Sequence, residues 1–326
     1  MQTPCVKVAR TDGEATRRTL AEADLLADEY KITHEDGWLY IPVTAPETVS
    51  DELEVVWREP PRRETQTLPA DLLGFDPSYE RIGTAALLDE DDPDQAREIA
   101  QAIVASDLPI DTVLNKASKV SGQTRTRAWD LLEGEDTEVV HREYGCTYRL
   151  DLAEVYFSPR LATERHRVVT EVTPGEHAFD MFAGVGPFVV PFARRGVECV
   201  AVDLNERAIE FLRENAVRND VDDRITAIAG DVCEVASDYH GWADRLVMNL
   251  PHSADEFLDT AVALASEECV IHYYDIQHED DPYGPGERAI RSAAEDDYEV
   301  TVETRRTVRS YAPHELNVCL DVRLRR

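Results

Sequence analysis

The stretch Phe179-Asp-Met-Phe-Ala-Gly-Val-Gly-Pro-Phe188 decides the fold of this chain of 326 residues. A short apolar run ends in an acid, and a turn rich in glycine follows it. Gly184 and Gly186 carry no Cβ, so the backbone can turn tightly there and a ligand can approach its amides. The pattern predicts a buried strand, a tight turn and a helix whose free N–H groups lie beside that turn.

The next apolar run, residues 197–202, ends in Asp203. An acid at this strand end of an open α/β sheet can accept hydrogen bonds from the hydroxyl groups of a ribose. The dinucleotide fingerprint G-x-G-x-x-G is absent, because the turn is Gly184-Val-Gly-Pro-Phe-Val189. Without that cradle for a pyrophosphate, the sequence favours S-adenosylmethionine over NAD or FAD as the cofactor.

Polar residues also follow the later strands of the predicted sheet. Asp231 comes after the third apolar strand, where it can accept a bond from an adenine amino group, and Asn249 ends the fourth. Asparagine offers both a donor and an acceptor, which suits the edge of a nucleobase. Taken alone, Asp231 fits a helix cap equally well, and Asn249 fits an Asx turn before Pro251. Four polar strand ends in order on one edge favour a cofactor site.

The composition is strongly acidic, with 34 Lys and Arg against 66 Asp and Glu and a net charge of −32. The acids are spread along the whole chain, which indicates a folded protein adapted to high salt, since salt screens the self-repulsion of such a charge. A negative charge of this size argues against nucleic-acid partners. In concentrated salt that objection weakens, and binding would then depend on local arginines and on shape.

Six scattered cysteines include no C-x-x-C pair, so we expect buried free thiols in a reducing cytosol and neither a metal site nor disulfides. No signal peptide or long apolar run is evident, which predicts a soluble, cytoplasmic protein without membrane association. No apolar dimer helix is evident either, and we expect a monomer.

Three parts are predicted along the chain. Residues 1–62 form a small α/β unit, with strands at 5–9 and 38–43 and a helix at 13–27. A proline-rich and polar passage near residues 59–70 is predicted as a linker.

Residues 75–165 are predicted as a middle domain. It contains a strand at 79–88, a helix at 93–105 with Asp92 as its N-cap, and a hairpin at 139–152. Residues 166–326 alternate strands and helices and end in an antiparallel pair, 298–308 and 316–324. A parallel sheet closed by a terminal hairpin favours a methyltransferase over a dehydrogenase architecture.

The sequence resembles the archaeal and eukaryotic tRNA (guanine-N1)-methyltransferases that act at position 37. The resemblance is carried by Tyr156-Phe-Ser-Pro-Arg-Leu-Ala-Thr-Glu-Arg165, Asp180-Met-Phe-Ala-Gly-Val-Gly-Pro-Phe188, Asn249-Leu-Pro-His-Ser-Ala254 and Ser310-Tyr-Ala-Pro313. It implies a class I S-adenosylmethionine-dependent methyltransferase domain (a Rossmann-like α/β fold), a small α+β middle domain and a small N-terminal α/β domain. The N-terminal domain would recognise the outer corner of the partner, tRNA.

The resemblance also implies roles for individual residues. Glu164 would be the general base that takes the N1 proton, and Arg125 would stabilise the charge on O6, with Arg127 as its rival. The implied substrate-binding residues are Tyr156, Arg160 and Pro251, with Asn249 orienting the base. The implied cofactor-binding residues are Asp180, Phe182, Gly184, Gly186, Asp203, Leu204, Asn205, Asp231, Val232 and Asn249.

Three other functions remain open from the sequence. A related enzyme transfers the 3-amino-3-carboxypropyl group of the same cofactor in wyosine synthesis at the same tRNA position, although the Asn249-Leu-Pro251 turn favours methyl transfer. A tRNA-binding scaffold without catalysis is the second, which the intact acids at the strand ends argue against. A small-molecule or protein methyltransferase is the third, and it leaves the first 150 residues unexplained.

Overall fold

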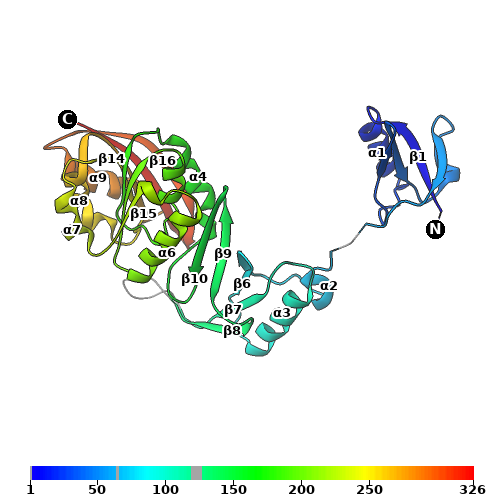
Figure 1. Ribbon diagram of the computed structural model, residues 1–326, viewed down its shortest axis with the longest axis horizontal. Coiled ribbons are helices and arrows are strands. Elements are labelled where there is room, and N and C mark those ends of the chain that lie inside the picture. Colours follow the sequence, from blue (N-terminus) through cyan, green and yellow to red (C-terminus); the bar gives the residue numbers. More distant parts are fainter. Residues whose placement is uncertain (1, 64–65, 119–126) are drawn as a thin grey trace. The chain divides into compact units, whose positions relative to one another are not determined.

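The computed structural model describes residues 2–63, 66–118 and 127–326, and the chain divides into two compact units, residues 1–68 and 69–326 (Figure 1). Each unit is described by itself. In the part of the chain that is described, no helix combines the length and the apolar composition needed to cross a bilayer.

The first unit is a small antiparallel sheet with one helix. Its strands have the order β2-β3-β1-β4, and Val6, Ile41 and Val43 lie in its buried core. The bounds are β1 Thr3–Ala9, α1 Gly13–Glu22, β2 Thr33–Glu35, β3 Trp38–Pro42 and β4 Glu54–Arg58. The prediction that the helix extends to residue 27 is wrong, because Asp24 adopts a left-handed φ of 56° and ends it.

The second unit begins with a four-stranded sheet of order β5-β6-β7-β8 and the helix α3. Its elements are α2 Pro69–Leu73, β5 Glu80–Ile82, β6 Ala85–Leu88, α3 Pro93–Ala105, β7 Thr112–Lys116 and β8 Trp129–Glu133. The helix and its cap are confirmed, since the Asp92 carboxylate accepts a hydrogen bond from the amide of Asp94 at 2.9 Å.

The single strand predicted at residues 79–88 is wrong, because Gly83 turns the chain into a hairpin there. Its φ is +60°, and a Cβ at this position would lie 2.4 Å from the carbonyl oxygen of Val140. Only glycine satisfies both constraints. The hairpin predicted at 139–152 is confirmed as β9 Glu138–Glu143 and β10 Cys146–Asp151.

The largest sheet has seven strands in the order β13-β12-β11-β14-β15-β17-β16. The strands from β13 to β15 run parallel, and β17 inserts antiparallel between β15 and β16. The predicted C-terminal antiparallel pair is confirmed. The strand bounds are β11 His177–Asp180, β12 Glu198–Asp203, β13 Ile225–Ala229, β14 Ala243–Met248, β15 Ala265–His278, β16 Glu299–Ala312 and β17 Glu315–Arg325.

Alternate residues of these strands bury their side chains on opposite faces, as the two-residue period of a strand requires. Ala178 and Ala201 pack in one apolar cluster, and Phe179 and Val200 pack in a second. The helices that complete the layers are α4 Ala162–Glu171, α5 Val189–Arg194, α6 Glu206–Arg218, α7 Val232–Val235, α8 Leu258–Leu264 and α9 Gly284–Ala294.

The hairpin β9–β10 is attached to α6 of the sheet domain (Figure 1). The side-chain oxygen of Asn215 accepts from the amide of Arg149 at 2.7 Å, and that of Asn219 accepts from the amide of Thr147 at 2.9 Å. These bonds place the segment that follows β10, which carries Tyr156, against the carboxyl edge of the sheet.

Candidate active site

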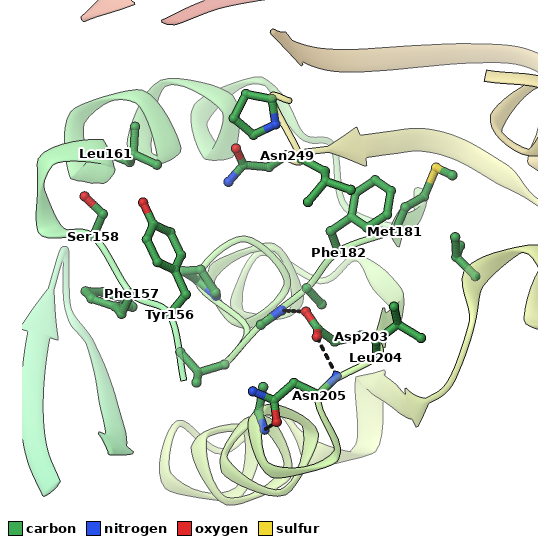
Figure 2. A pocket seen from close by; sticks show the side chains of 18 of the residues that line it. Tyr156, Phe157, Ser158, Leu161, Met181, Phe182, Asp203, Leu204, Asn205 and Asn249 are labelled. Atoms are coloured by element: carbon green, nitrogen blue, oxygen red, sulfur yellow. Dashed lines mark hydrogen bonds between the residues drawn. The ribbon is translucent and has the colours of Figure 1, made fainter. Parts of the chain in front are cut away.

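A cavity of about 250 Å³ opens at the carboxyl edge of β11, β12, β13 and β14 (Figure 2). It is bounded on its other sides by the segment after β10 and by β15, β16 and β17. The residues predicted from the sequence that line this cavity are Tyr156, Phe182, Gly184, Asp203, Leu204, Asn205, Asp231, Val232, Asn249 and Pro251.

Asp203 organises the turn between β11 and α5. Its Oδ2 accepts a hydrogen bond from the amide of Gly184 at 2.7 Å, and its Oδ1 accepts from the amide of Asn205 at 2.9 Å (Figure 2). Burial raises the pKa of the Asp203 carboxyl, and the two backbone bonds oppose that rise. An ionised carboxylate has further lone pairs, so it can also accept from a ligand hydroxyl group in the cavity.

The two glycines of this turn have different surroundings. Gly184 has a φ of +52°, and a Cβ on it would meet no atom nearer than the carbonyl oxygen of Tyr156 at 4.0 Å. Gly186 has a φ of +88°, and its Cβ would lie 3.0 Å from a side-chain carbon of Leu212. Gly184 therefore leaves room on the cavity side, whereas Gly186 lets the turn pack on α6 and does not line the cavity.

Asp180 is buried, with 1% of its surface exposed, and it does not line the cavity. Its Oδ1 accepts from the amide of Phe182 at 3.2 Å, while its Oδ2 has no hydrogen-bond partner among the described residues. Burial raises the pKa of this carboxyl to about 8, against the smaller opposite effect of the Phe182 bond. The acid predicted as a cofactor ligand thus lies behind the turn.

Replacing Asp180 by asparagine is expected to remove a pH-dependent loss of stability. The unfolded carboxyl ionises near ~4, while the folded one keeps its proton up to about 8. The wild-type protein therefore loses stability as the pH rises through that window, and Asp180→Asn does not. Melting temperatures from about pH 5 to about pH 9, which cover most of this window and about one unit above it, test this. Equal pH profiles for the two proteins would contradict it, and Glu198→Gln, at an exposed site on β12, is the control.

Asp231 and the apolar residues near it form the end of the cavity beyond Asp203. The Asp231 carboxylate caps α7 by accepting from the amide of Cys233 at 2.8 Å, and the residue also lines the cavity. Asp231 can therefore cap α7 and line the cavity at the same time. The rings of Phe182 and Phe257 meet edge to face at 5.0 Å and form an apolar wall.

Asn249 and Tyr156 project into the same space from opposite sides of the cavity (Figure 2). The turn that carries Asn249 is held by two contacts with the C-terminal half of the sheet. The amide of Ile276 donates to the carbonyl oxygen of Pro251 at 3.0 Å, and the ring of His252 lies 3.0 Å (Nε2 to Oη) from the hydroxyl group of Tyr311. The turn that carries Asn249 is thereby fixed to the strands β15 and β16.

Glu164 lies in the first turn of α4 and is 4% exposed. Its carboxylate accepts from Arg167 at 2.6 Å and from the Tyr274 hydroxyl group at 3.3 Å, and it pairs with Arg306 at 2.8 Å. Glu164 is not among the cavity-lining residues, although Leu161 and Arg165, close to it in the chain, are. The structure places it next to the cavity wall, in contact with three other side chains.

Behind Glu164 lies a buried polar network. The ring of His272 lies between Asp321 (Nδ1 to Oδ1, 2.6 Å) and Arg245 (Nε2 to Nη1, 2.7 Å). Because arginine only donates, Nε2 must accept, and Nδ1–H donates to Asp321. Although burial opposes ionisation, His272 and Arg167 hold the pKa of Asp321 below its usual range. Cys319 completes a group of possible metal ligands, but the described partners of this group are guanidinium groups that would repel a cation.

A second cavity, of about 130 Å³, adjoins the first and shares four wall residues with it: Tyr156, Phe157, Ser158 and Arg309. Its wall also includes Lys116, Arg127 and Arg160. Lys116 pairs with Asp89 and Arg160 with Glu80, whereas the guanidinium of Arg127 lies 5.3 Å from the centre of the Trp129 ring. Arg125, the predicted partner of O6, lies outside the described residues.

Sequence reasoning missed several cavity residues. Phe257, Arg309 and Asn317 carried no recognised signal, and Arg165 and Tyr311 appeared only as members of quoted motifs. Arg165 donates to Glu143 at 2.8 Å and to the carbonyl oxygen of Ser158 at 3.1 Å, so it braces the segment that carries Tyr156. The apposition of strands distant in sequence would have been needed to find Arg309 and Asn317.

The cavity residues fit a nucleoside with a charged, phosphate-free tail. Carboxylates at Asp203 and Asp231 suit hydroxyl and amino groups, and the walls of Leu204, Val232 and Phe182 suit an adenine ring. Arg165 and Arg309 are the cations among the described residues of the wall, and Arg309 lies on β16, on the other side of β11 and β14 from β12 and its Asp203. This donor set offers no cradle for a pyrophosphate.

Comparisons with known proteins find matches to tRNA-modifying enzymes along nearly the whole chain. A family model described as the TRM5/TYW2 methyltransferase domain matches residues 139–302. Models described as the tRNA methyltransferase 5 N-terminal domain and the TYW2 N-terminal domain match residues 5–51 and 65–137.

The chain is 42% identical to the tRNA (guanine(37)-N(1))-methyltransferase Trm5b of Pyrococcus abyssi, over 99% of each protein. It is 34% identical to the tRNA(Phe) (4-demethylwyosine(37)-C(7)) aminocarboxypropyltransferase of Pyrococcus horikoshii, over 80% of this chain and 94% of that protein.

Two solved structures are similar to this chain over nearly its full length. A complex of aTrm5 with tRNALeu has a TM-score of 0.73 and 32% identity, over 98% of this chain and 99% of that one. Methanocaldococcus jannaschii Trm5 in complex with adenosine has a TM-score of 0.67 and 30% identity, over 99% of each chain.

Proposed function

The chain belongs to the TRM5/TYW2 methyltransferase family, and we infer that it methylates N1 of guanine 37 in tRNA with S-adenosylmethionine as the methyl donor. The observation that carries this function is the 42% identity to a tRNA (guanine(37)-N(1))-methyltransferase over 99% of both chains. The shape and the donor set of the cavity agree with it.

S-adenosylmethionine supplies an electrophilic methyl group when it is bound. In this proposal Asp203 accepts from the ribose and Asp231 from the adenine amino group, while Leu204, Val232 and Phe182 enclose the adenine ring. The turn at Gly184, held by Asp203, approaches the tail of the cofactor. Asn205 supports this arrangement indirectly, because its side chain caps α6 through the amides of Arg207 and Ala208.

The acceptor requires a base, because N1 of guanine carries a proton at neutral pH and is a poor nucleophile. Glu164 is the proposed acceptor of that proton. To reach a base in the cavity, the Glu164 carboxylate gives up its ion pair with Arg306, whose own side chain is half-exposed. Asn249 and Tyr156 would hold the base between them, with Pro251 closing the same turn.

Loss of the N1 proton places negative charge on O6, and a guanidinium in a dry pocket stabilises such charge. Arg125 remains the proposed donor on the family pattern. Arg127 is its rival, since it lines the cavity that adjoins Tyr156. Arg160 and Lys116 in the same wall are proposed to meet tRNA phosphates.

The proposed division of labour has three parts: residues 1–62 recognise the outer corner of tRNA, residues 75–165 bind RNA and support catalysis, and residues 166–326 carry the cofactor. Guanine 37 is stacked in its loop and must leave the stack to reach Asn249. We also propose that the protein works as a monomer in the cytoplasm.

Aminocarboxypropyl transfer is the nearest competing reaction. The P. horikoshii enzyme named for it matches 80% of this chain, whereas the P. abyssi methyltransferase matches 99%. The match of residues 5–51 to the tRNA methyltransferase 5 N-terminal domain also favours methyl transfer. A scaffold without catalysis would not need Asp203, Asp231 and Asn249 at the strand ends that border the cavity.

Incubation of the protein with unmodified tRNA transcripts tests the function. We expect label from the methyl group of the cofactor to enter a transcript with guanosine at position 37. We expect none to enter a matched transcript with adenosine there. Equal labelling of both transcripts, or none of either, would contradict the proposal.

Adaptation to high salt gives a prediction about stability. The net charge of −32 repels itself in dilute buffer, and salt screens that repulsion. Raising KCl from about 0.1 M to about 2 M is expected to raise the melting temperature. Thermal unfolding measured by circular dichroism checks this, and a melting temperature that falls or stays constant over this range would refute it.

A further inference from the structure

A third cavity, of about 280 Å³, lies where the tip of the β9–β10 hairpin meets α4 and α5. It is about as large as the first cavity, with which it shares Arg165 and Pro187 in the wall. The wall also contains Tyr144 from the tip of the hairpin, and Arg194 and Arg195 from the end of α5. No step of the proposed function uses this cavity.

Tyr144 occupies a backbone position that disfavours tyrosine. It forms the two-residue turn of the hairpin with Gly145, and both residues have a positive φ, of 44° and 81°. Such a turn is normally built from Asn-Gly, because asparagine tolerates the left-handed region better than a bulky side chain does. The residue is also 56% exposed, so little of its apolar surface is buried in return. A strained and exposed aromatic residue indicates a function for its ring.

The ring of Tyr144 is positioned to stack on a planar ligand. It lies parallel to the ring of His166 on α4, with 3.9 Å between the ring centres and 3° between the planes, and both residues line the cavity. His166 covers one face of the tyrosine ring, and the exposure of Tyr144 leaves the other face open. Every nucleobase has a flat face that can stack on an aromatic ring.

The wall of the cavity carries a positive charge in a chain whose net charge is −32. Its described residues include one carboxylate, that of Glu143, which accepts from Arg165 at 2.8 and 2.5 Å. Although burial opposes ionisation, Arg165 and His141 hold the pKa of Glu143 below its usual range. Glu143 therefore stays ionised and neutralises Arg165, which leaves Arg194 and Arg195 as the net charge.

Arg194 and Arg195 are available to an anion. Both are exposed, and neither forms an ion pair with a residue in the described part of the chain. Arg194 donates to the carbonyl oxygen of Gly145, so its guanidinium lies beside the turn that carries Tyr144. Guanidinium groups next to an aromatic ring suit a phosphate that is attached to a stacked base.

We propose that the third cavity binds a nucleotide, with its base stacked on Tyr144 and its phosphate at Arg194 and Arg195. Pro191 and Val169 in the same wall supply apolar contacts. The nucleotide comes from one of two sources, the bound tRNA or a free mononucleotide. The first source rests on the proposed function, whereas the second does not.

Tyr144→Asn separates this role from a purely structural one. Asparagine is favoured at this position of the turn, so the variant loses the ring without adding backbone strain, and its melting temperature is expected to stay near the wild-type value or to rise. Arg195→Gln removes one of the two charges. Arg218→Gln is the matched control, because Arg218 is an exposed arginine on α6 that lines none of the three cavities.

Two probes identify the source of the nucleotide. Adenosine 5′-monophosphate is titrated by calorimetry into protein whose first cavity is saturated with S-adenosylmethionine, and unmodified tRNA transcript is bound by filter retention in the same KCl buffer. Tyr144→Asn and Arg195→Gln are each expected to weaken binding about fivefold or more, as the loss of a stacking ring or a phosphate contact does. Arg218→Gln is expected to bind as the wild type does. Weaker binding of tRNA alone assigns the cavity to a nucleotide of tRNA, and weaker binding of the monophosphate assigns it to free nucleotides.

Two results would overturn the proposal. One is wild-type affinity of both variants for both probes. The other is a Tyr144→Asn protein that melts lower and binds more weakly while Arg195→Gln binds normally, since the ring would then act only by holding the hairpin on α4. If the wild type methylates no transcript but binds the monophosphate through Tyr144 and Arg195, the proposed function fails and the nucleotide site stands.

Discussion

Replacing Glu164 by glutamine is expected to lower the single-turnover rate of methyl transfer about 10²- to 10⁴-fold, the usual contribution of a positioned general base. Glutamine has nearly the same shape and cannot take the N1 proton. Rapid-quench measurement with enzyme in excess over tRNA gives this rate directly. The affinities for cofactor and tRNA are expected to change little, because neither proposed binding surface contains Glu164.

Glu171→Gln is the control for this variant. Glu171 pairs with the same arginine, Arg167, but lies at the exposed end of α4. Its loss therefore removes a comparable ion pair without removing the proposed base. A Glu164→Gln protein that binds cofactor normally and transfers methyl groups at the rate of Glu171→Gln would exclude Glu164 as the base.

Arg167, which pairs with both Glu164 and Glu171, also donates a hydrogen bond to the Asp321 carboxylate at 2.7 Å. Arg167 therefore keeps carboxylate partners when Glu164 becomes glutamine, so the variant is expected to fold. Asp321 in turn receives the Nδ1 hydrogen of His272. This network explains why a polar cluster buried to this degree is compatible with a stable core.

Replacing Asp203 by alanine is expected to weaken cofactor binding about a hundredfold or more, since a lost hydrogen bond from a ribose hydroxyl group to a carboxylate costs ~1.5–3 kcal/mol and the turn at Gly184 is no longer held in place. The variant leaves the amides of Gly184 and Asn205 unpaired and also removes the proposed ribose acceptor. Calorimetric titration with S-adenosylmethionine gives the dissociation constant. The rate at saturating cofactor is expected to fall far less than the affinity.

Glu206→Ala is the matched control for Asp203, because Glu206 is an exposed acid nearby in the chain that does not line the cavity. Asp203→Asn, which keeps one acceptor oxygen, is expected to bind the cofactor with intermediate affinity. If Asp203→Ala binds S-adenosylmethionine with wild-type affinity, Asp203 does not bind the cofactor.

Local signals in the sequence were sufficient to predict which strand ends border the first cavity. The apolar run before Asp203, the glycine turn and the polar residue Asp231 each depend on neighbours in the chain, and the structure brings them to one cavity. The orientation of Asp180 was not accessible in this way. It depends on which face of the sheet the last residue of β11 presents, and here that carboxyl is buried behind the turn.

The remaining features could not be predicted because they depend on the pairing of strands that are distant in the sequence. The sequence predicted the pair of C-terminal strands but not that β17 inserts between β15 and β16. That insertion alone brings Asn317 beside Arg309 and both of them to the cavity. The hairpin at Gly83 was missed for a similar reason, because the backbone that leaves no room for a Cβ there belongs to Val140, 57 residues later in the chain.

Nucleoside analysis of the tRNA product tests most directly whether this chain places a methyl group on N1 of guanine 37. After reaction with unlabelled cofactor in concentrated KCl, the transcript is digested and its nucleosides are identified by mass and retention. We expect 1-methylguanosine in place of the single guanosine at position 37. A nucleoside carrying an aminocarboxypropyl group, a methyl group on another atom, or unmodified guanosine at that position would contradict it.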